Sequence, residues 1–193
     1  MKLWTMQPVS LLNELDRTGV FRCDESKSFN LTKENSLKPQ YNWLIDQMEQ
    51  KIGKRPKGVK FPIWAWHTWE FKRQMPDPDS AAFLKRDGDR VFLTIDIPEE
   101  KVVLTDFDAW QNVMTDGFVS AATNEREYDR EAELLDTTDD TELAKLIQKS
   151  WQNVFIVDKV DNEFLTRGKY IQATFWEIIP EYIIDVQKLN STK

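Results

Sequence analysis

The sequence predicts an α+β fold, a single compact domain with a mixed or antiparallel sheet and several helices. The chain has 193 residues, a length that suits one well-buried domain better than two small ones. Segments with the alternation of a strand and segments with the spacing of a helix are interspersed. They do not follow the regular strand–helix order of a doubly wound parallel sheet. The composition, 40% hydrophobic and 31% charged, is typical of a globular protein.

In the first third of the chain, proline and glycine mark the ends of the predicted elements. Proline is tolerated in the first turn of a helix, because an N–H at that position has no partner in any case. Glycine often ends a helix by adopting a left-handed conformation. The expected order is a strand at 2–7, a helix from Pro8 to Gly19, a strand at 20–23, a polar loop at 24–38 and a helix from Pro39 to Gly53.

The middle of the chain predicts two strands and the start of a helix. Residues 61–69 are dense in aromatic and β-branched side chains, which favour a strand. A tight turn at 87–89 precedes residues 90–97, whose alternation predicts a half-buried strand. Thr105 and Asp108 are spaced like a capping box, so we expect a helix to begin there.

The last third of the chain predicts an acidic helical excursion at about 120–150 and then the longest apolar strand. The excursion contains a break at 136–140. The strand is expected at 170–179 and ends at Pro180. A short helix or an extended tail around 182–186 completes the chain.

The charge of the protein is negative, and the excess is concentrated in one segment. The whole chain carries 33 acidic and 26 basic residues, a net charge of −7. This balance argues against direct nucleic-acid binding and against docking on an anionic membrane surface. Residues 125–149 hold nine acidic and four basic residues. They form either a solvated helical flap or a surface that meets a basic partner.

The few potential metal ligands predict no metal site. One cysteine, Cys23, and one histidine, His67, cannot build a structural zinc site or an internal disulfide. Asp106 and Asp108 have a spacing that can hold Mg²⁺ with phosphates, but at a helix start such residues more often act as caps. No stretch approaches the roughly 18 apolar residues of a membrane helix, so we expect a cytoplasmic protein.

Glu177 is the most informative candidate for chemistry. If 170–179 is one continuous strand, Glu177 lies in an otherwise apolar row. Such a carboxylate must be ion-paired, metal-bound or more readily protonated, because burying an unpaired charge is costly. Two interpretations stay open. Glu177 is either a catalytic carboxylate or the partner of an arginine, such as Arg22, Arg73 or Arg167.

The other candidates surround an expected ligand on a tryptophan-rich sheet. His67 is either a hydrogen-bonded residue at a strand end or a general base, since its usual pKa lies near neutrality. Eight tryptophans are an unusual number for this length, and those outside the core could stack on a ligand. No glycine-rich dinucleotide motif or P-loop is present in the sequence. The expected site comprises Glu177 and His67 as catalytic residues and Gln7, Trp66, Gln172 and Trp176 as ligand-binding residues.

Several separate blocks of sequence carry a family resemblance. They are residues 3–7, 43–48, 62–66, 104–110, 150–151 and 171–177. In this order they resemble the bacterial domain-of-unknown-function 3841 family over nearly the whole chain. The resemblance implies one cytosolic domain encoded by a bacterium or a phage, and it brings no established activity.

A more distant resemblance is to ADP-ribosyltransferase-like domains. These small α+β domains begin with a short strand and a helix, and they place an acid or a glutamine on a late strand near the NAD ribose. The resemblance implies such positions for Gln172 and Glu177. The chain departs from the pattern in its first strand, where Thr5 and Gln7 stand in place of the usual His or Arg.

Two functions from different classes follow from these observations. The first is binding of a nucleotide- or NAD-like small molecule, with a possible glycosidic transfer or hydrolysis. There the Glu177 carboxylate would act as acid or base beside an oxocarbenium-like transition state. The alternative is a non-enzymatic interaction or inhibitory factor that uses the acidic segment 125–142 against a basic surface of a protein partner. The sequence does not identify a cofactor.

Overall fold

The computed structural model confirms the α+β class. Internal contacts divide the chain into two units, and each is described by itself below. The single domain expected over residues 1–193 stays a prediction. The first unit comprises Met1–His67, Arg73–Val103 and Ala173–Lys193, and the second comprises Thr68–Lys72 and Leu104–Gln172. The structure describes residues 1–32, 37–78, 80 and 89–189, and all of the turn expected at 87–89 except Asp89 lies outside them.

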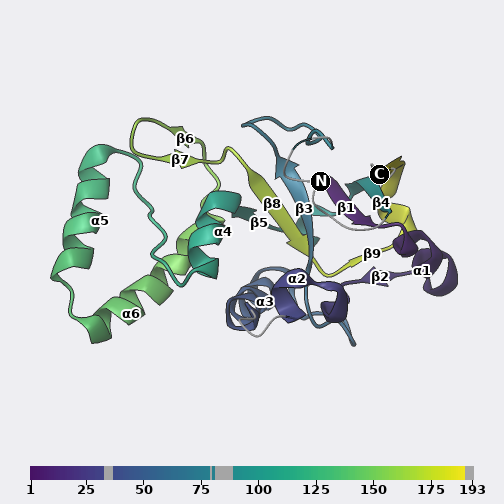
Figure 1. Ribbon diagram of the computed structural model, residues 1–193, viewed down its shortest axis with the longest axis horizontal. Coiled ribbons are helices and arrows are strands. Elements are labelled where there is room, and N and C mark those ends of the chain that lie inside the picture. Colours follow the sequence, from purple (N-terminus) through teal and green to yellow (C-terminus); the bar gives the residue numbers. More distant parts are fainter. Residues whose placement is uncertain (33–36, 79, 81–88, 190–193) are drawn as a thin grey trace. The chain divides into compact units, whose positions relative to one another are not determined.

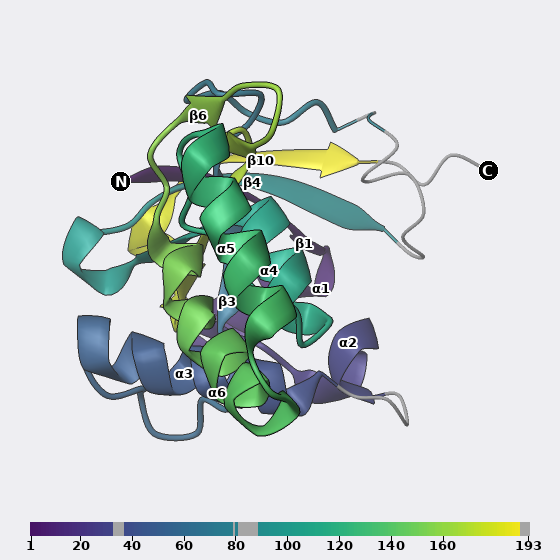
Figure 2. The same ribbon diagram turned by 90° about the vertical axis from the view of Figure 1, so that its left-hand side faces the viewer.

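A six-stranded sheet has the strand order β10-β4-β1-β3-β8-β5 (Figure 1). Strand β1 pairs antiparallel with β3 and with β4. Strand β10 pairs antiparallel with β4, and Figure 2 shows these two strands side by side. The antiparallel pairing agrees with the sequence prediction. The strands are β1 (Lys2–Pro8), β3 (Ile63–Thr68), β4 (Arg90–Asp96), β5 (Val103–Asp106), β8 (Ile171–Phe175) and β10 (Ile183–Leu189).

Strand β4 differs from the half-buried strand that its alternation predicts. All five residues from Val91 to Ile95 are buried, whichever face they occupy. The strand lies between β1 and β10 in the sheet, and both of its faces are covered. Thr94 is therefore buried among aliphatic and aromatic residues, although its place in the alternation suggested exposure.

The two longer helices of the first unit end at the predicted glycines, but the first of them begins at Ser10 and not at Pro8, which is the last residue of β1. Helix α1 (Ser10–Thr18) is followed by Gly19, which has a φ of 73° and donates its N–H to the Leu15 carbonyl. Helix α3 (Lys38–Ile52) has proline in its first turn and ends at Gly53. The buried side of α3 carries Tyr41, Leu44, Ile45 and Met48.

The polar segment expected to be a loop contains two short helical turns, so that expectation was incomplete. A 3-10 turn, η1 (Glu25–Lys27), is capped by Asp24, whose carboxylate accepts from the Ser26 N–H at 3.0 Å. A single α-helical turn, α2 (Phe29–Thr32), follows it. Short turns of this kind have too few residues to show a hydrophobic period, and only the capping residue indicates them.

The strand expected at 170–179 is interrupted, so its predicted continuity was wrong. Strand β8 ends at Phe175, Trp176 forms a bend, and β9 (Glu177–Ile178) pairs antiparallel with β2 (Phe21–Arg22) in a separate two-stranded sheet. The bend removes Glu177 from the apolar row of β8. A 3-10 turn, η4 (Pro180–Tyr182), then leads into β10, so the end of the chain is extended.

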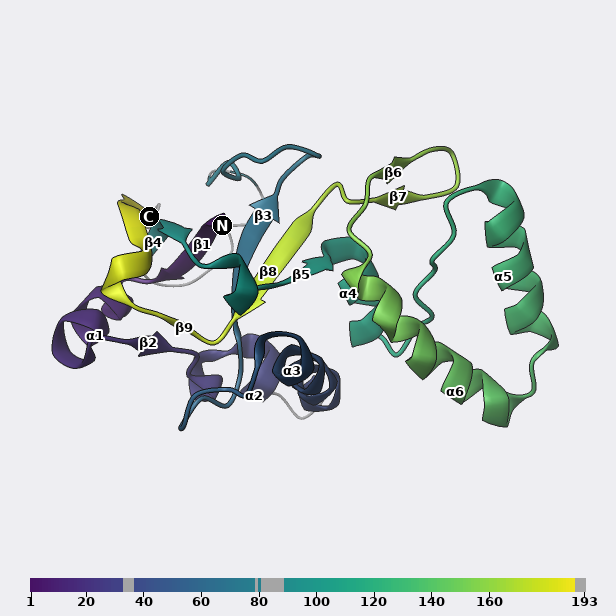
Figure 3. The ribbon, with the colours of Figure 1, turned by 180° about the vertical axis from the view of Figure 1, so that it is seen from behind.

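The second unit contains the acidic helices that the sequence predicts. Helix α5 (Glu125–Thr137) and helix α6 (Asp140–Ser150) meet at a short turn and diverge from it (Figure 3). Helix α4 (Phe107–Met114) is capped by Asp106, not by Thr105 as predicted. The unit also contains the 3-10 turn η3 (Trp151–Phe155) and the short strands β6 (Val160–Asp161) and β7 (Thr166–Arg167).

Candidate functional site

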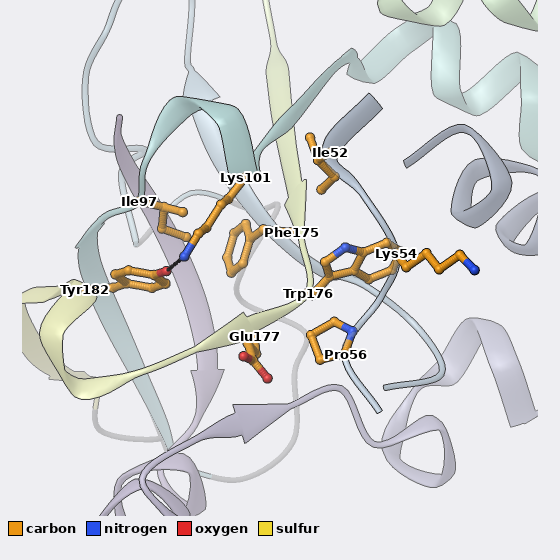
Figure 4. A pocket seen from close by; sticks show the side chains of 9 residues that line it. All are labelled: Ile52, Lys54, Pro56, Ile97, Lys101, Phe175, Trp176, Glu177 and Tyr182. Carbon is orange, nitrogen blue, oxygen red and sulfur yellow. Dashed lines mark hydrogen bonds between the residues drawn. The ribbon is translucent and has the colours of Figure 1, made fainter. Parts of the chain in front are cut away.

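A pocket of about 210 Å³ lies within the first unit. It forms where the end of α3, the 3-10 turn η2 (Glu99–Lys101) and the chain after β8 come together (Figure 4). The bend after β8 places two successive side chains in its wall. The lining residues are Ile52, Lys54, Pro56, Ile97, Lys101, Phe175, Trp176, Glu177 and Tyr182.

The wall of the pocket combines apolar side chains with one buried donor. Phe175, Trp176 and Ile97 are all buried. The Trp176 side chain is only 8% exposed, and its Nε1–H has no hydrogen-bond partner among the described residues. A buried indole N–H normally finds a partner, because leaving it unpaired costs free energy. The wall of the pocket therefore contains flat apolar surface and a buried donor that no described residue satisfies.

One side of the pocket carries a lysine–tyrosine pair. The Lys101 Nζ donates to the Tyr182 hydroxyl at 3.0 Å, and it lies 5.7 Å from the centre of the Tyr182 ring. The hydrogen bond to Tyr182 is the main reason why the pKa of Lys101 is raised. In Figure 4 the Phe175 ring lies between this pair and the Trp176 indole.

The other lysine of the pocket, Lys54, is exposed at the rim. Figure 4 shows its ammonium group extending away from the remaining labelled side chains. Within the described part of the chain it forms no hydrogen bond or ion pair. The pocket thus has two accessible cations in a protein whose net charge is −7.

Glu177 forms an ion pair with Arg22. The two residues face each other across β2 and β9, and the Arg22 Nε and Nη2 donate to Glu177 Oε2 at 3.1 and 3.0 Å. The Glu177 side chain is 29% exposed. This is the arginine pairing that the sequence left open, and it occurs at a residue that also lines the pocket. A carboxylate held in this way is a fixed hydrogen-bond acceptor.

His67 lies in β3, outside the pocket lining. Its backbone carbonyl accepts from the Arg73 Nη1, and the Arg73 Nη2 donates to the Lys2 carbonyl at 2.7 Å. The pKa of His67 is lowered from 6.5 to about 4, chiefly by burial and also by the positive charges of Arg73 and the N-terminal amine. The imidazole is therefore neutral at pH 7, with a pKa well below the value best suited to a general base there.

The lowered pKa of His67 predicts how stability changes with pH. The unfolded chain takes up a proton on His67 near pH 6.5, and the folded chain does so only near pH 4. Stability is therefore fully present above pH 6.5, and this contribution is lost as the pH falls toward 4. The full shift corresponds to at most ~3 kcal/mol, and we expect about 1 kcal/mol because the residue is partly solvated.

Urea denaturation at pH 7.0, 5.5 and 4.5 measures this contribution. The His67→Gln variant, which does not titrate, should lose less stability between pH 7.0 and 4.5 than the wild type. Identical losses in the two proteins would show that His67 does not contribute to the acid sensitivity. The Cys23→Ser variant serves as a control, because Cys23, with a pKa raised to about 11, does not titrate in this range.

The remaining predicted site residues occupy the sheet and do not line the pocket. The Gln7 Nε2 donates to the Thr5 hydroxyl at 2.8 Å. Trp66 stands opposite Trp4 in the β1–β3 register. Gln172 is the second residue of β8 and belongs to the second unit. Of the six predicted residues, the pocket brings together only Trp176 and Glu177.

The sequence analysis missed the other polar groups of the pocket. Lys54 follows the predicted helix end at Gly53 and belonged to no predicted helix or strand, and Tyr182 was assigned only to the terminal segment. Lys101 carried no motif at all. These residues come from three separate stretches of the chain, and no local spacing connects them.

A second group of polar side chains, in the second unit, is already paired. The Tyr170 hydroxyl donates to the Glu70 carboxylate, which also lies 3.4 Å from the Lys169 Nζ. The hydrogen bond to Glu70 is the main cause that raises the pKa of Tyr170 to about 12. Glu70 and Phe71 have φ values of 53° and 59°, so a tight left-handed turn presents the carboxylate. We assign this group a structural role.

The two carboxylates considered for Mg²⁺ are likewise explained by structure. The Asp106 carboxylate accepts from the backbone N–H groups of Ala109 and Gly168, at 2.9 and 2.6 Å. Burial and the neighbouring Asp106 raise the pKa of Asp108. No three potential ligands gather into a metal site in the described residues. Nor is any helix there both long and apolar enough to span a membrane.

Comparison with known proteins gives one match. The family model "Domain of unknown function (DUF3841)" matches residues 2–184. No curated protein matches the chain, and no solved structure does. The matched region includes all nine residues that line the pocket and both helices of the acidic excursion.

Proposed function

We propose that this chain, which belongs to the DUF3841 family, binds a nucleotide-like small molecule in the pocket beside Trp176. The observation that carries the proposal is the buried Trp176 N–H, which has no partner among the described residues. A heteroaromatic ring has acceptor atoms in its plane, so a ring that displaces the side-chain atoms now covering Nε1 would satisfy this donor and cover the Phe175 surface. Concave sites with apolar walls and a few polar groups are the usual form of small-molecule sites.

The size and charge of the pocket indicate which part of the ligand it holds. A volume of about 210 Å³ is below the roughly 300–1,000 Å³ of typical ligand pockets. It accommodates a single ring system, and the rest of a nucleotide would lie outside. The exposed ammonium groups of Lys54 and Lys101 are the cations available there for a phosphate.

Glu177 would act on the sugar of such a ligand. An ion-paired carboxylate accepts hydrogen bonds from hydroxyl groups, as a ribose would provide. If a glycosidic bond is broken at this site, the same negative charge would stabilise an oxocarbenium-like transition state electrostatically. The Arg22 pairing favours this electrostatic role over proton donation by Glu177. Binding is the first claim, and transfer or hydrolysis is an extension of it.

Ligand binding can be measured by thermal shift and by titration calorimetry. We expect AMP, ADP-ribose or NAD at millimolar concentration to raise the Tm. The Trp176→Phe variant keeps an aromatic ring but lacks the N–H, so it should bind the same ligand about 5- to 10-fold more weakly. Lys101→Ala should weaken phosphate-bearing ligands and leave nucleosides unaffected.

Trp66→Phe is the matched control, because it makes the same substitution at a predicted site residue outside the pocket. It should leave the affinity within about twofold of the wild-type value. The proposal fails if none of the three ligands raises the Tm, or if Trp176→Phe and Trp66→Phe change the affinity equally.

A further inference from the structure

We propose that the outer face of α5 docks a cationic segment of a partner protein. This face is the acidic stripe formed by Glu125, Asp129, Glu133 and Asp136, with Tyr128 beside it. The proposal concerns the second unit and is independent of the pocket in the first. The alternative function expected from the sequence was binding of a basic protein partner by the acidic segment. The proposal assigns this binding to a defined surface and states the chemistry of the partner.

Helix α5 lacks the buried face that normally stabilises a helix of its length. None of its 13 residues is buried. Isolated helices of about 12–15 residues are marginal in water, and packing usually supplies their stability. Two large apolar side chains of α5 are exposed, Tyr128 by 44% and Leu134 by 46%. The helix therefore presents surface that a partner would cover.

Two glutamates show which side of α5 faces the chain that precedes it. The Glu127 carboxylate accepts from the Thr123 N–H at 2.8 Å, and the Glu131 carboxylate accepts from the Ala121 N–H at 3.0 Å. The Ser120 hydroxyl also donates to Glu131. These bonds turn the face of residues 127 and 131 toward residues 120–123.

The acidic stripe lies on the opposite side of the helix. At 3.6 residues per turn, its four members fall within about 80° of the circumference, roughly opposite the face of residues 127 and 131. Tyr128 borders the stripe. The arrangement places a row of carboxylates outward, away from the contacts that hold the helix, with an aromatic ring along one margin.

The carboxylates of the stripe form no ion pair with any described residue. Within the described part of the chain, residues 125–149 form a single ion pair, between Lys145 and Glu142 on α6. The Arg130 guanidinium donates to the Arg126 carbonyl and not to a carboxylate. Glu125, Asp129 and Glu133 follow one another at i, i+4 spacing, where like charges repel. A cationic partner would remove this repulsion.

The spacing of the stripe indicates the form of the partner. Successive carboxylates are one helical turn apart, about 5–6 Å, which matches lysines or arginines on one face of an amphipathic helix. An aromatic side chain at the edge of a charged face is a common anchor in protein interfaces. The partner segment is therefore a helix with a basic face and an adjoining apolar side chain that packs on Tyr128.

A fluorescein-labelled 14-residue helical Lys/Leu peptide serves as the probe, and anisotropy measures its binding to the full chain at 50 and 300 mM NaCl. Substituting the stripe should weaken binding at least 10-fold at the lower salt concentration. A matched control with the same change in net charge, on exposed residues elsewhere in the second unit, should weaken it less than 3-fold. The stripe variant is Glu125→Gln/Asp129→Asn/Glu133→Gln, and the control variant is Asp140→Asn/Asp158→Asn/Glu163→Gln.

Two further readouts separate docking from general charge attraction. Tyr128→Ser should weaken binding at both salt concentrations, because the contact it removes is apolar and not screened by salt. The stripe variant should keep the wild-type Tm or exceed it, because like-charge repulsion has been removed. The proposal is overturned if the wild type does not bind the peptide, or if the stripe and control variants weaken binding equally.

Discussion

Replacing Asp106 with alanine is expected to lower the free energy of unfolding by about 3 kcal/mol. The side chain is 2% exposed, and its two oxygens accept separate backbone N–H groups. One oxygen caps α4 through Ala109, and the other holds Gly168. Alanine would leave both N–H groups without this partner, and the one of Gly168 is buried. Loss of an N-cap alone costs about 1 kcal/mol, and each buried donor left unpaired costs about 1–3 kcal/mol.

Urea denaturation of Asp106→Ala beside Asp108→Asn tests this expectation. Asp108 is two residues away, carries the same charge and forms no cap, so its substitution should change stability by less than about 0.5 kcal/mol. A second sign is electrostatic: without Asp106, the pKa of Asp108 should fall toward its ordinary value. Equal stability of the two variants would show that the Asp106 hydrogen bonds contribute nothing.

Replacing Gly168 with alanine is expected to be comparably damaging, by about 2–4 kcal/mol. Gly168 has a φ of 77°, a conformation that L side chains rarely adopt. A Cβ there would lie 2.9 Å from the Val157 carbonyl oxygen and 3.2 Å from the Lys159 Cα. Both are backbone atoms, which cannot move aside as the end of a flexible side chain can. The substitution therefore adds a steric clash to the conformational strain.

Gly19→Ala separates these two effects. Gly19 has a similar φ of 73°, but nothing lies within 4 Å of the position its Cβ would take. We expect this control to cost about 1 kcal/mol, from strain alone. The difference between the two variants in thermal or urea unfolding measures the clash at Gly168. If Gly168→Ala is no less stable than Gly19→Ala, the close packing against residues 157–159 is not present in solution.

The parts of the fold that were predictable from sequence are those with local signals. Glycine placed the ends of α1 and α3 correctly and proline placed the start of α3, because these residues act through their own backbone conformation. Pro8 did not place the start of α1, since it is the last residue of β1 and the helix begins at Ser10. The acidic helices followed from spacing and composition. Capping of α4 was misassigned by one residue, from Thr105 to Asp106, because both are residues that accept hydrogen bonds at a helix start.

The features that sequence reasoning missed depend on partners far along the chain. The bend at Trp176 exists because β9 leaves the six-stranded sheet and pairs with β2, more than 150 residues earlier. No pattern within residues 170–179 carries that information. The burial of both faces of β4 likewise depends on the elements that pack over the sheet, and nothing within residues 90–96 indicates it.

The candidate site likewise contains residues that the sequence indicated locally and residues that it did not. Trp176 and Glu177 were found because an indole and a carboxylate stand out in an apolar stretch. Lys101 and Tyr182 are 81 positions apart, so their pairing could not be predicted from the sequence around either residue. His67, the other predicted catalytic residue, attracted notice as the only histidine, and its surroundings keep it neutral at pH 7.

The discontinuous path of the first unit has a consequence for biosynthesis. Its three segments enclose the continuous stretch from Leu104 to Gln172, so the ribosome completes that stretch before the first unit has all its strands. Four of the nine pocket residues, from Phe175 to Tyr182, emerge only after that stretch. The nascent chain therefore has no pocket until residues 175–182 have left the ribosome, after the second unit's long segment, and a ligand that bound the pocket would select chains in which the first unit is complete.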